Sequence, residues 1–425
     1  MRLLGVIVTV ALLAVTPVAQ KDKWNKRTPM PMPTSDFTCT TVDQSILCVG
    51  GCVEGQVCPD REDLYCFCPN VTREVHAYTP DLDSWGALPS APRPRYRHAA
   101  AALGGQLYLI GGRSTTDELI AEVDVYDTST GTWETLSSPH DMPIPSSDLA
   151  AFLLDSAIHV VGGYDRHYST LNAHQIFHTG NRSWTKGPPM GSARGDFTAV
   201  TIGGKGYVFG GFASDFCHPL DSLEVFDPPP DNDWRELKAM DTPRADKAGV
   251  ALNGHFMVIG GEQKHSDPSK CEKLSVPVND VESYSPKDDE WTQMRPIPSE
   301  RMRFAGAAYG DSVYIFGGQG RLDSNEKPPT HPIYDTVEEY RLCDDGLQNG
   351  NELGVDCGGS CQPCTDEDQR TGVVGGDDEV YEVAFGGTQR ESEESTSGES
   401  IPVGAGGVRL AVALGLIAVA FIDRM

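Results

Sequence analysis

The chain has 425 residues, enough for roughly two or three average domains or for one large repeat fold. Its 45 glycines and 30 prolines favour many short strands joined by tight turns over long helices. A formal net charge of -27 argues against a protein that binds nucleic acid, or an anionic membrane surface, through bulk electrostatics.

Residues 1–19 have the pattern of a secretory signal peptide. Arg2 precedes an apolar run that ends near Val15, and cleavage is expected near Ala19, although Pro17 departs from the usual small-residue signature. The run is shorter than the ~20 apolar residues that a transmembrane helix needs. We therefore expect residues 1–19 to be removed and the remaining chain to be exported.

Tryptophan marks an internal repeat. All six tryptophans recur at intervals of about fifty residues, each after a short polar turn and before a Pro-containing stretch. They are Trp24, Trp85, Trp133, Trp184, Trp234 and Trp291. A single tryptophan would be a weak signal, but the shared spacing predicts repeated structural units.

Paired glycines give a second mark between successive tryptophans. An apolar alternating strand ends in Gly50-Gly51, Gly111-Gly112, Gly162-Gly163, Gly210-Gly211, Gly260-Gly261 and Gly317-Gly318. Double glycine allows positive φ and close backbone approach, which inner strands need where they crowd a central channel. Further strands such as 123–127 and 337–340 follow the pairs, so four strands are expected per repeat.

These marks resemble the kelch-repeat family over roughly residues 24–342. The resemblance implies an all-β, six-bladed propeller, to which we assign residues 20–342. Because no tryptophan follows the strand at 337–340, the segment around Trp24 is expected to supply the outer strand of the sixth blade and to close the ring. The alternative is a disordered N-terminus whose tryptophan recurs by chance.

Twelve cysteines in an exported chain are expected to pair. Six belong to the first blade or to a Cys-rich insertion at 52–72: Cys39, Cys48, Cys52, Cys58, Cys66 and Cys68. Cys39 is expected opposite Cys48 across a hairpin, and the other connectivity in this group stays open. Cys217 and Cys271 occupy equivalent loops of adjacent blades, so a disulfide between them is favoured over two free thiols.

Three segments follow the predicted propeller. Residues 343–364, with Cys343, Cys357, Cys361 and Cys364, resemble a small cysteine-rich module, for which two disulfides are favoured over a Ca²⁺ site because the spacing matches no EF-hand loop. Residues 365–399 are acidic and predict a disordered stalk. Residues 400–425 end in a short apolar run without a basic tail, which favours a GPI-attachment signal over a transmembrane span.

The expected location is therefore the extracellular face of the cell surface, with the membrane contacted through the C-terminal anchor. Glycosylation sequons at Asn70 and Asn181 fit the same route.

The kelch resemblance implies that partners bind the face formed by the inter-blade loops and the loops after each second strand. Candidate ligand-binding residues on these loops are Arg95, Arg97, Arg113, Tyr164, Arg166, Arg194, Arg244, Arg301 and Arg303. Guanidinium groups suit carboxylate or sulfate, so we expect an acidic protein segment or an acidic glycan as partner. The alternative for each arginine is an ion pair with a nearby Asp or Glu. The tripeptide Arg194-Gly195-Asp196 also spells an integrin-type motif, although the repeat itself accounts for its arginine.

A sugar-modifying enzyme is the alternative function. The kelch fold includes galactose oxidase, with copper bound by Tyr and His, and sugar-acid mutarotases, which use Arg, Glu or His at the axis. Tyr96, His98, Tyr164 and His167 are present here, but no unclustered cysteine accompanies them. Nucleophile-elbow, phosphate-binding and HExxH motifs are absent from the sequence. We therefore predict a binding or adhesion protein with no catalytic residue, metal or cofactor.

Overall fold

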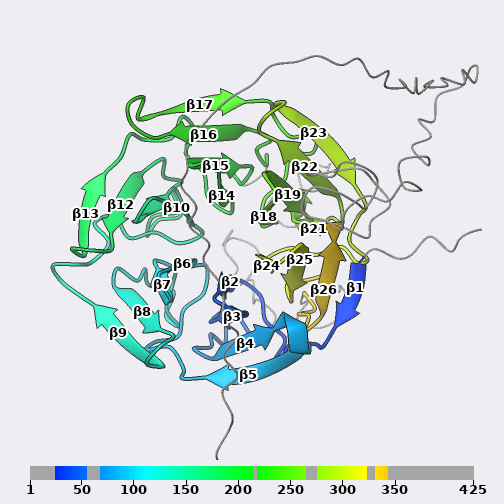
Figure 1. The fold of residues 1–425 in the computed structure, drawn as a ribbon, viewed down its shortest axis with the longest axis horizontal. Coiled ribbons are helices and arrows are strands. Elements are labelled where there is room, and N and C mark those ends of the chain that lie inside the picture. Colours follow the sequence, from blue (N-terminus) through cyan, green and yellow to red (C-terminus); the bar gives the residue numbers. More distant parts are fainter. Residues whose placement is uncertain (1–23, 55–67, 214–217, 265–274, 323–330, 343–425) are drawn as a thin grey trace, which may run out of the picture. The chain divides into compact units, whose positions relative to one another are not determined.

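The computed structural model describes residues 24–54, 68–213, 218–264, 275–322 and 331–342. These residues form six four-stranded antiparallel sheets around one axis, as Figure 1 shows. Within them the one helical element is the 3-10 turn η1 (Pro80–Leu82). The all-β, six-bladed propeller predicted from the repeat is confirmed.

Each blade is named here by its strands in order from the axis outward. Blade 1 contains β2 (Thr38–Val42), β3 (Ser45–Val49), β4 (Val75–Thr79) and β5 (Ser84–Leu88), and blade 2 contains β6 (Ala99–Leu103), β7 (Gln106–Ile110), β8 (Val123–Asp127) and β9 (Thr132–Leu136). Blade 3 contains β10 (Ala150–Leu154), β11 (Ala157–Val161), β12 (His174–His178) and β13 (Ser183–Lys186), and blade 4 contains β14 (Thr198–Ile202), β15 (Lys205–Phe209), β16 (Leu223–Asp227) and β17 (Asp233–Leu237).

Blades 5 and 6 depart from simple chain order. Blade 5 contains β18 (Ala248–Leu252), β19 (His255–Ile259), β22 (Val281–Ser285) and β23 (Glu290–Met294), with a separate ribbon of β20 (Glu262–Lys264) and β21 (Ser275–Pro277) in its second loop. Blade 6 contains β24 (Ala305–Tyr309), β25 (Ser312–Phe316), β26 (Val337–Arg341) and, as its outer strand, β1 (Trp24–Arg27).

The N-terminal strand closes the ring as predicted. Strand β1 pairs antiparallel with β26, and Trp24 lies opposite Tyr340. The Arg27 Nε donates to the Glu339 carboxylate at 3.0 Å. Because β1 continues into blade 1, the two ends of the propeller are joined and the sixth blade has its fourth strand.

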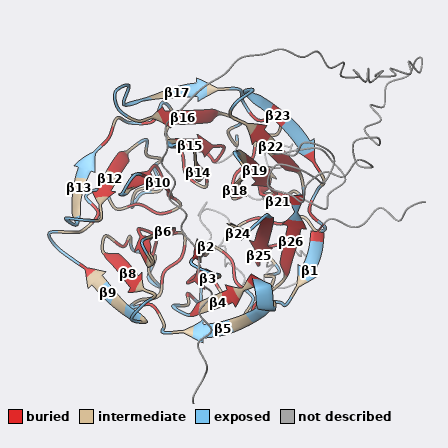
Figure 2. Cartoon of the chain, viewed as in Figure 1, coloured by how far each residue is buried: buried red, intermediate tan, exposed pale blue. Residues whose placement is uncertain are grey.

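Close backbone packing explains the paired glycines. Gly111 and Gly112 follow β7 with φ of +67° and +85°. A Cβ atom on Gly111 would lie 2.6 Å from the Ser146 carbonyl oxygen, and a Cβ atom on Gly112 would lie 2.6 Å from the Tyr96 carbonyl oxygen. Glycine is therefore required where the end of a second strand meets the loops of its own and the next blade. Figure 2 shows the inner strands buried and the outer strands largely exposed.

The tryptophans join neighbouring blades. Each indole packs in a tilted arrangement against an aromatic residue directly opposite on the third strand, with ring centroids 4.9–5.3 Å apart. Each indole N–H also donates to a backbone carbonyl of the preceding blade, as from Trp133 to Pro89 at 2.8 Å and from Trp291 to Lys238 at 2.8 Å. The fifty-residue spacing thus reflects one contact repeated at every blade junction.

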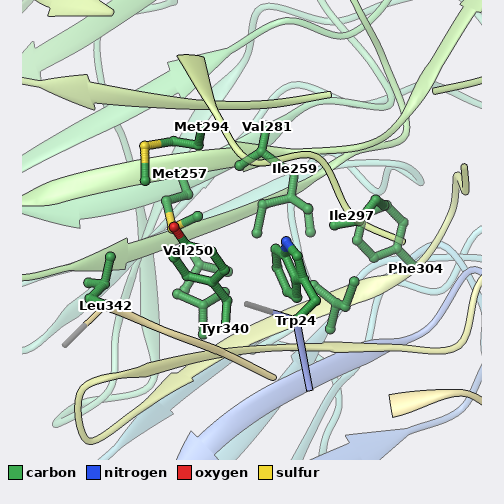
Figure 3. Packing of buried hydrophobic residues seen from close by; sticks show 13 residues of the cluster. Trp24, Val250, Met257, Ile259, Val281, Met294, Ile297, Phe304, Tyr340 and Leu342 are labelled. Carbon is green, nitrogen blue, oxygen red and sulfur yellow. The ribbon is translucent and has the colours of Figure 1, made fainter. Parts of the chain in front are cut away.

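Figure 3 shows the core at the junction of blades 5 and 6. Trp24 and Tyr340 pack there among Val250, Ile259 and Phe304, and all five side chains are buried. The closing strand therefore stabilises the ring through apolar burial in addition to its backbone hydrogen bonds.

Two disulfides lie in the described residues. Cys39–Cys48 joins β2 to β3 at directly opposite positions, as predicted, with Cα atoms 4.1 Å apart. Cys52–Cys68 connects the two ends of the insertion. The described residues contain no helix long and apolar enough to cross a membrane. The predictions for Cys58, Cys66, Cys217 and Cys271, for the leader at 1–19 and for residues 343–425 concern positions outside the described residues.

Candidate functional site

Four arginines of the inter-blade loops are buried. Arg95, Arg194, Arg244 and Arg301 are all 0% exposed. Each guanidinium contacts a carboxylate on the third strand of its own blade; the pairs are Arg95–Asp124, Arg194–Glu224, Arg244–Glu282 and Arg301–Glu338. The structure therefore corrects the expectation that these four groups face a ligand, because they have no surface to offer one.

Comparison between blades explains these pairs. The Nη1 of each arginine also donates to the carbonyl of the first glycine in the blade's pair, at 3.0–3.4 Å. In blade 3 the arginine position holds Ser146, whose hydroxyl donates to the Gly162 carbonyl at 3.1 Å, and Gln175 replaces the carboxylate. In blade 1 the two positions hold Thr34 and His76. Blades without the arginine also lack the carboxylate, so the arginine serves blade architecture.

The Arg194-Gly195-Asp196 tripeptide is not displayed for adhesion. Arg194 is held by Glu224 inside blade 4, and Asp196 lines the central channel. A Cβ on Gly195 would lie 2.3 Å from the Tyr164 ring, so this glycine is required by packing.

One residue from each blade entry forms a ring at the mouth of the channel, which we call the axial ring. Its members are Asp36, Arg97, Asp148, Asp196, Asp246 and Arg303. All six have φ between 50° and 56°, which is uncommon for residues other than glycine. The N–H of each donates to the carbonyl of the preceding member at 2.8–3.2 Å, and Asp36 donates to Arg303, so the hydrogen bonds form a closed circle.

The axial ring is electrostatically uneven. Arg97 Nε lies 3.4 Å from Asp36 and 3.6 Å from Asp148, and Arg303 Nε lies 2.9 Å from Asp246. Four carboxyl groups thus face two guanidinium groups. Burial, and then the Asp148 carboxylate, raise the pKa of Asp196 to about 7, and burial also raises the pKa of Asp148.

A second layer packs beneath the axial ring. It consists of Phe37, His98, Leu149, Phe197, Lys247 and Phe304, each against the first glycine of the preceding blade's pair. Lys247 occupies a position that is apolar in four other blades. Its Nζ has no hydrogen-bond partner among the described residues and lies 5.4 Å from the centroid of the Phe209 ring. Burial holds the pKa of Lys247 well below its ordinary value.

The channel offers little space. A cavity of about 120 Å³ lies between the axial ring and the second layer, and one of about 230 Å³ lies along the inner strands. Both are below the ~300 Å³ at which sites for drug-sized ligands begin. The channel can hold water or a very small molecule.

A larger cleft lies between the loops of blades 2 and 3. It has a volume of about 600 Å³ and is lined by Arg113, Asp117, Glu118, Leu119, Pro145, Asp165 and Arg166. Leu119 and Pro145 form an apolar wall, and the neighbouring Ile144 is 41% exposed. Arg166 is exposed, forms no ion pair among the described residues, and donates its Nε–H to His167 at 2.9 Å. We call this the blade 2–3 cleft.

Hydrogen bonds hold the floor of this cleft. The hydroxyls of Tyr96 and Tyr168 donate to the two oxygens of Asp117 at 2.5 and 2.6 Å. Arg113 lies 3.8 Å from the centroid of the Tyr168 ring and donates to the carbonyls of Asp117 and Asp165 at 2.8 and 3.1 Å. Loops from two blades are therefore cross-linked beneath an exposed rim.

The predicted ligand-binding residues thus fall into groups that differ in their access to solvent and in their place in the fold. Arg166 reaches an accessible cleft; Arg113 and Tyr164 are 2% exposed and support it from below. Arg97 and Arg303 belong to the axial ring. Sequence reasoning missed Leu119 and Pro145, and the signal that was available is the apolar Ile144 next to Pro145 in a Pro-containing loop.

Among the described residues, no group of three or more His, Cys, Asp and Glu is arranged to hold a metal ion. Tyr96 and Tyr164, which the enzyme alternative named, donate their hydroxyls to Asp117 and Asp196.

Six blades with this tryptophan and double-glycine geometry, four of them with the buried arginine–carboxylate pair, define a kelch-type β-propeller. A family model described as the KLHDC2/KLHL20/DRC7 Kelch-repeats domain matches residues 70–193 and 97–318. Because these matches together cover more than half of the chain, the protein belongs to the kelch-repeat family.

Several kelch proteins are similar over the propeller. Kelch repeat protein M-T8 of Myxoma virus (strain Lausanne) is 24% identical over 53% of this chain and 41% of its own length. Alpha-scruin of Limulus polyphemus is 25% identical over 67% of this chain and 30% of its own length. Kelch-like protein 23 of Mus musculus is 25% identical over 61% of this chain and 45% of its own length. The matches thus span less than half of each of these relatives.

Among solved structures, one titled "Structure of YjhT" superimposes with a TM-score of 0.59 and 15% identity, over 73% of this chain and 96% of that chain. This likeness supports the fold alone.

Proposed function

We propose that the chain is an exported kelch propeller that binds a partner protein in the blade 2–3 cleft. The observation that carries the proposal is an accessible 600 Å³ cleft with an apolar wall beside Arg166, above a floor already fixed by hydrogen bonds. A preformed site avoids much of the entropic cost of ordering loops upon binding. Volumes of 300–1,000 Å³ are typical of ligand sites.

The cleft favours a particular chemistry in its partner. Leu119 and Pro145 suit an apolar side chain, and Arg166 suits a carboxylate next to it. Glu118 on the exposed rim disfavours a second acid. We therefore prefer an acidic protein segment with an apolar anchor over an acidic glycan, which has no use for the apolar wall.

Location at the outer cell surface is part of the same proposal. The two disulfides of blade 1 suit an oxidising compartment. Asn181 is exposed in the turn between β12 and β13, where a glycan would not disturb the packing of the blade. The leader at 1–19 and the C-terminal anchor signal at 400–425 complete this route.

Selection from a phage-displayed random peptide library on the full exported chain tests the proposal. We expect enriched peptides that combine an acidic and an apolar residue, with retention reduced about tenfold or more by Arg166→Glu or by Leu119→Asp. Lys186→Glu, at an exposed position of β13, is the matched control and should leave retention unchanged. Peptides retained equally by all variants, or binding of sulfated glycans without any peptide, would contradict it.

A further inference from the structure

Two carboxyl groups of the axial ring lie side by side. Asp148 of blade 3 and Asp196 of blade 4 follow one another around the ring. The Asp196 N–H donates to the Asp148 carbonyl at 3.2 Å, and both residues line the same small cavity. Neighbouring carboxyl groups can hydrogen-bond to one another only when one of them carries a proton, because two carboxylates have only acceptors. Like charges this close cannot both ionise without a large cost in a buried site.

The surroundings do not supply a cation to replace that proton. Arg97 is shared between Asp36 and Asp148, and Arg303 is directed at Asp246. The other titratable groups that act on Asp148, Asp196 and Asp246 are Arg113, Tyr164, Glu262 and Lys247. Arg113 is engaged by the blade 2–3 loops and Lys247 is directed toward Phe209. Asp196 therefore lies between two further carboxyl groups with no guanidinium of its own.

Side-chain contacts connect this pair to the blade 2–3 cleft along two routes. Tyr164 donates its hydroxyl to Asp196 at 2.7 Å and is followed in the chain by Asp165 and Arg166 of the cleft. On the other side, Arg97 lies 5.3 Å from the centroid of the Tyr96 ring, and Tyr96 donates to Asp117 of the cleft floor.

We propose that Asp148 and Asp196 share one proton at and below neutral pH, and that its loss loosens the loops that form the blade 2–3 cleft. On deprotonation the proton passes to water and the axial ring gains one negative charge. Asp148, Asp196 and Asp246 then repel one another, and the repulsion acts on Tyr164 and Arg97, the two residues that tie the ring to the cleft. The cleft is thus ordered at mildly acidic pH and more mobile at alkaline pH.

An effect of pH on partner binding rests on the proposed function, since the order of the cleft affects binding only if the cleft is the binding site. The loop motion itself does not require a partner, so it can be measured on the protein alone.

Hydrogen exchange of the full exported chain, at about pH 6 and about pH 8 and corrected for intrinsic rates, tests the inference. We expect the protection of residues 114–119 and 164–170 to fall about tenfold between these values in the wild type. Asp196→Asn keeps a donor toward Asp148 but cannot ionise, and should retain protection at the higher pH. Asp231→Asn, an exposed aspartate before β17, is the control and should behave as wild type.

Equal protection of the wild type at both pH values, or loss of protection in Asp196→Asn as well, would overturn the inference. If Asp196→Asn does not fold, Asp148→Asn tests the same pair, and the infrared carbonyl band of a protonated carboxyl group should be present in the wild type at the lower pH and absent from the variant. Peptide capture at pH 6 separates the two proposals: a pH switch without capture contradicts the proposed function alone, and capture without a switch contradicts this inference alone.

Discussion

Trp24 and Tyr340 are 316 positions apart in the chain yet lie directly opposite one another, with ring centroids 5.1 Å apart. Trp24 is 5% exposed and its indole N–H points to the Arg295 carbonyl of blade 5. One side chain thus joins the chain start to the end of blade 6 and to the neighbouring blade.

Trp24→Ala is therefore expected to lower the free energy of unfolding by ~3–5 kcal/mol, because it removes a buried indole and leaves a cavity at the junction that closes the ring. Urea denaturation measures the loss. Lys26→Ala, at an exposed position of the same strand, is the control and should change stability by less than ~0.5 kcal/mol. Equal stability of the two variants would contradict the closure of the ring by strand β1.

The buried arginine–carboxylate pairs predict strong non-additivity. Arg244→Met leaves Glu282 buried without its cation and is expected to cost ~3–5 kcal/mol of unfolding free energy. Adding Glu282→Leu removes the unpaired charge, so the double variant should recover a large part of that loss. A double-mutant cycle in urea measures the coupling energy. If the losses of unfolding free energy in the two single variants add up to the loss in the double variant, Arg244 and Glu282 are not energetically coupled.

How far the sequence predicts this fold depends on what repeats. Trp85, Gly111 and their equivalents recur because every blade makes the same junction, so six blades and the closing β1 strand could be inferred. The role of Arg244 could not, because its partner Glu282 is distant in the chain and an inter-blade arginine has the same spacing whether it points inward or outward.

The candidate site was less predictable for a different reason. The blade 2–3 cleft combines Leu119 of one blade with Arg166 of the next. The two loops are equally long, but Thr170 stands at the position of Leu119 and Thr115 at that of Arg166, so neither cleft residue belongs to the repeated pattern. The axial ring depends on positive φ at six non-glycine positions. Nothing in the sequence around residues such as Asp148 and Arg97 indicates that the backbone adopts this conformation there.

The buried histidine pair predicts sensitivity to acid. His159 Nδ1 and His174 Nε2 lie 2.8 Å apart, and burial lowers the pKa of His159 from 6.5 to about 3 and that of His174 to about 4. The unfolded chain binds these protons first, so stability is complete above about pH 6.5 and falls as the pH drops toward about 4. His159→Phe with His174→Leu should flatten the acid limb of a plot of stability against pH. If the double variant lost stability toward low pH as steeply as the wild type, the histidine pair would not be the cause of the acid sensitivity.

Disulfide mapping tests the predicted export of the chain. Non-reducing peptide mapping of the secreted protein is expected to show Cys39–Cys48, Cys52–Cys68 and a peptide that joins Cys217 to Cys271. Free thiols at the last two positions would contradict the pairing. Glycosidase treatment that leaves the mass at Asn181 unchanged would argue against passage through the secretory route.

Photo-crosslinking from the blade 2–3 cleft tests the binding account most directly. A photo-reactive amino acid placed at Leu119 of the full chain is expected to capture a partner, and the same group placed at Lys186 of β13 is not. Capture from Leu119 that is lost on Arg166→Glu is the predicted result. Capture from Lys186 but not from Leu119 would show that the propeller binds through another surface.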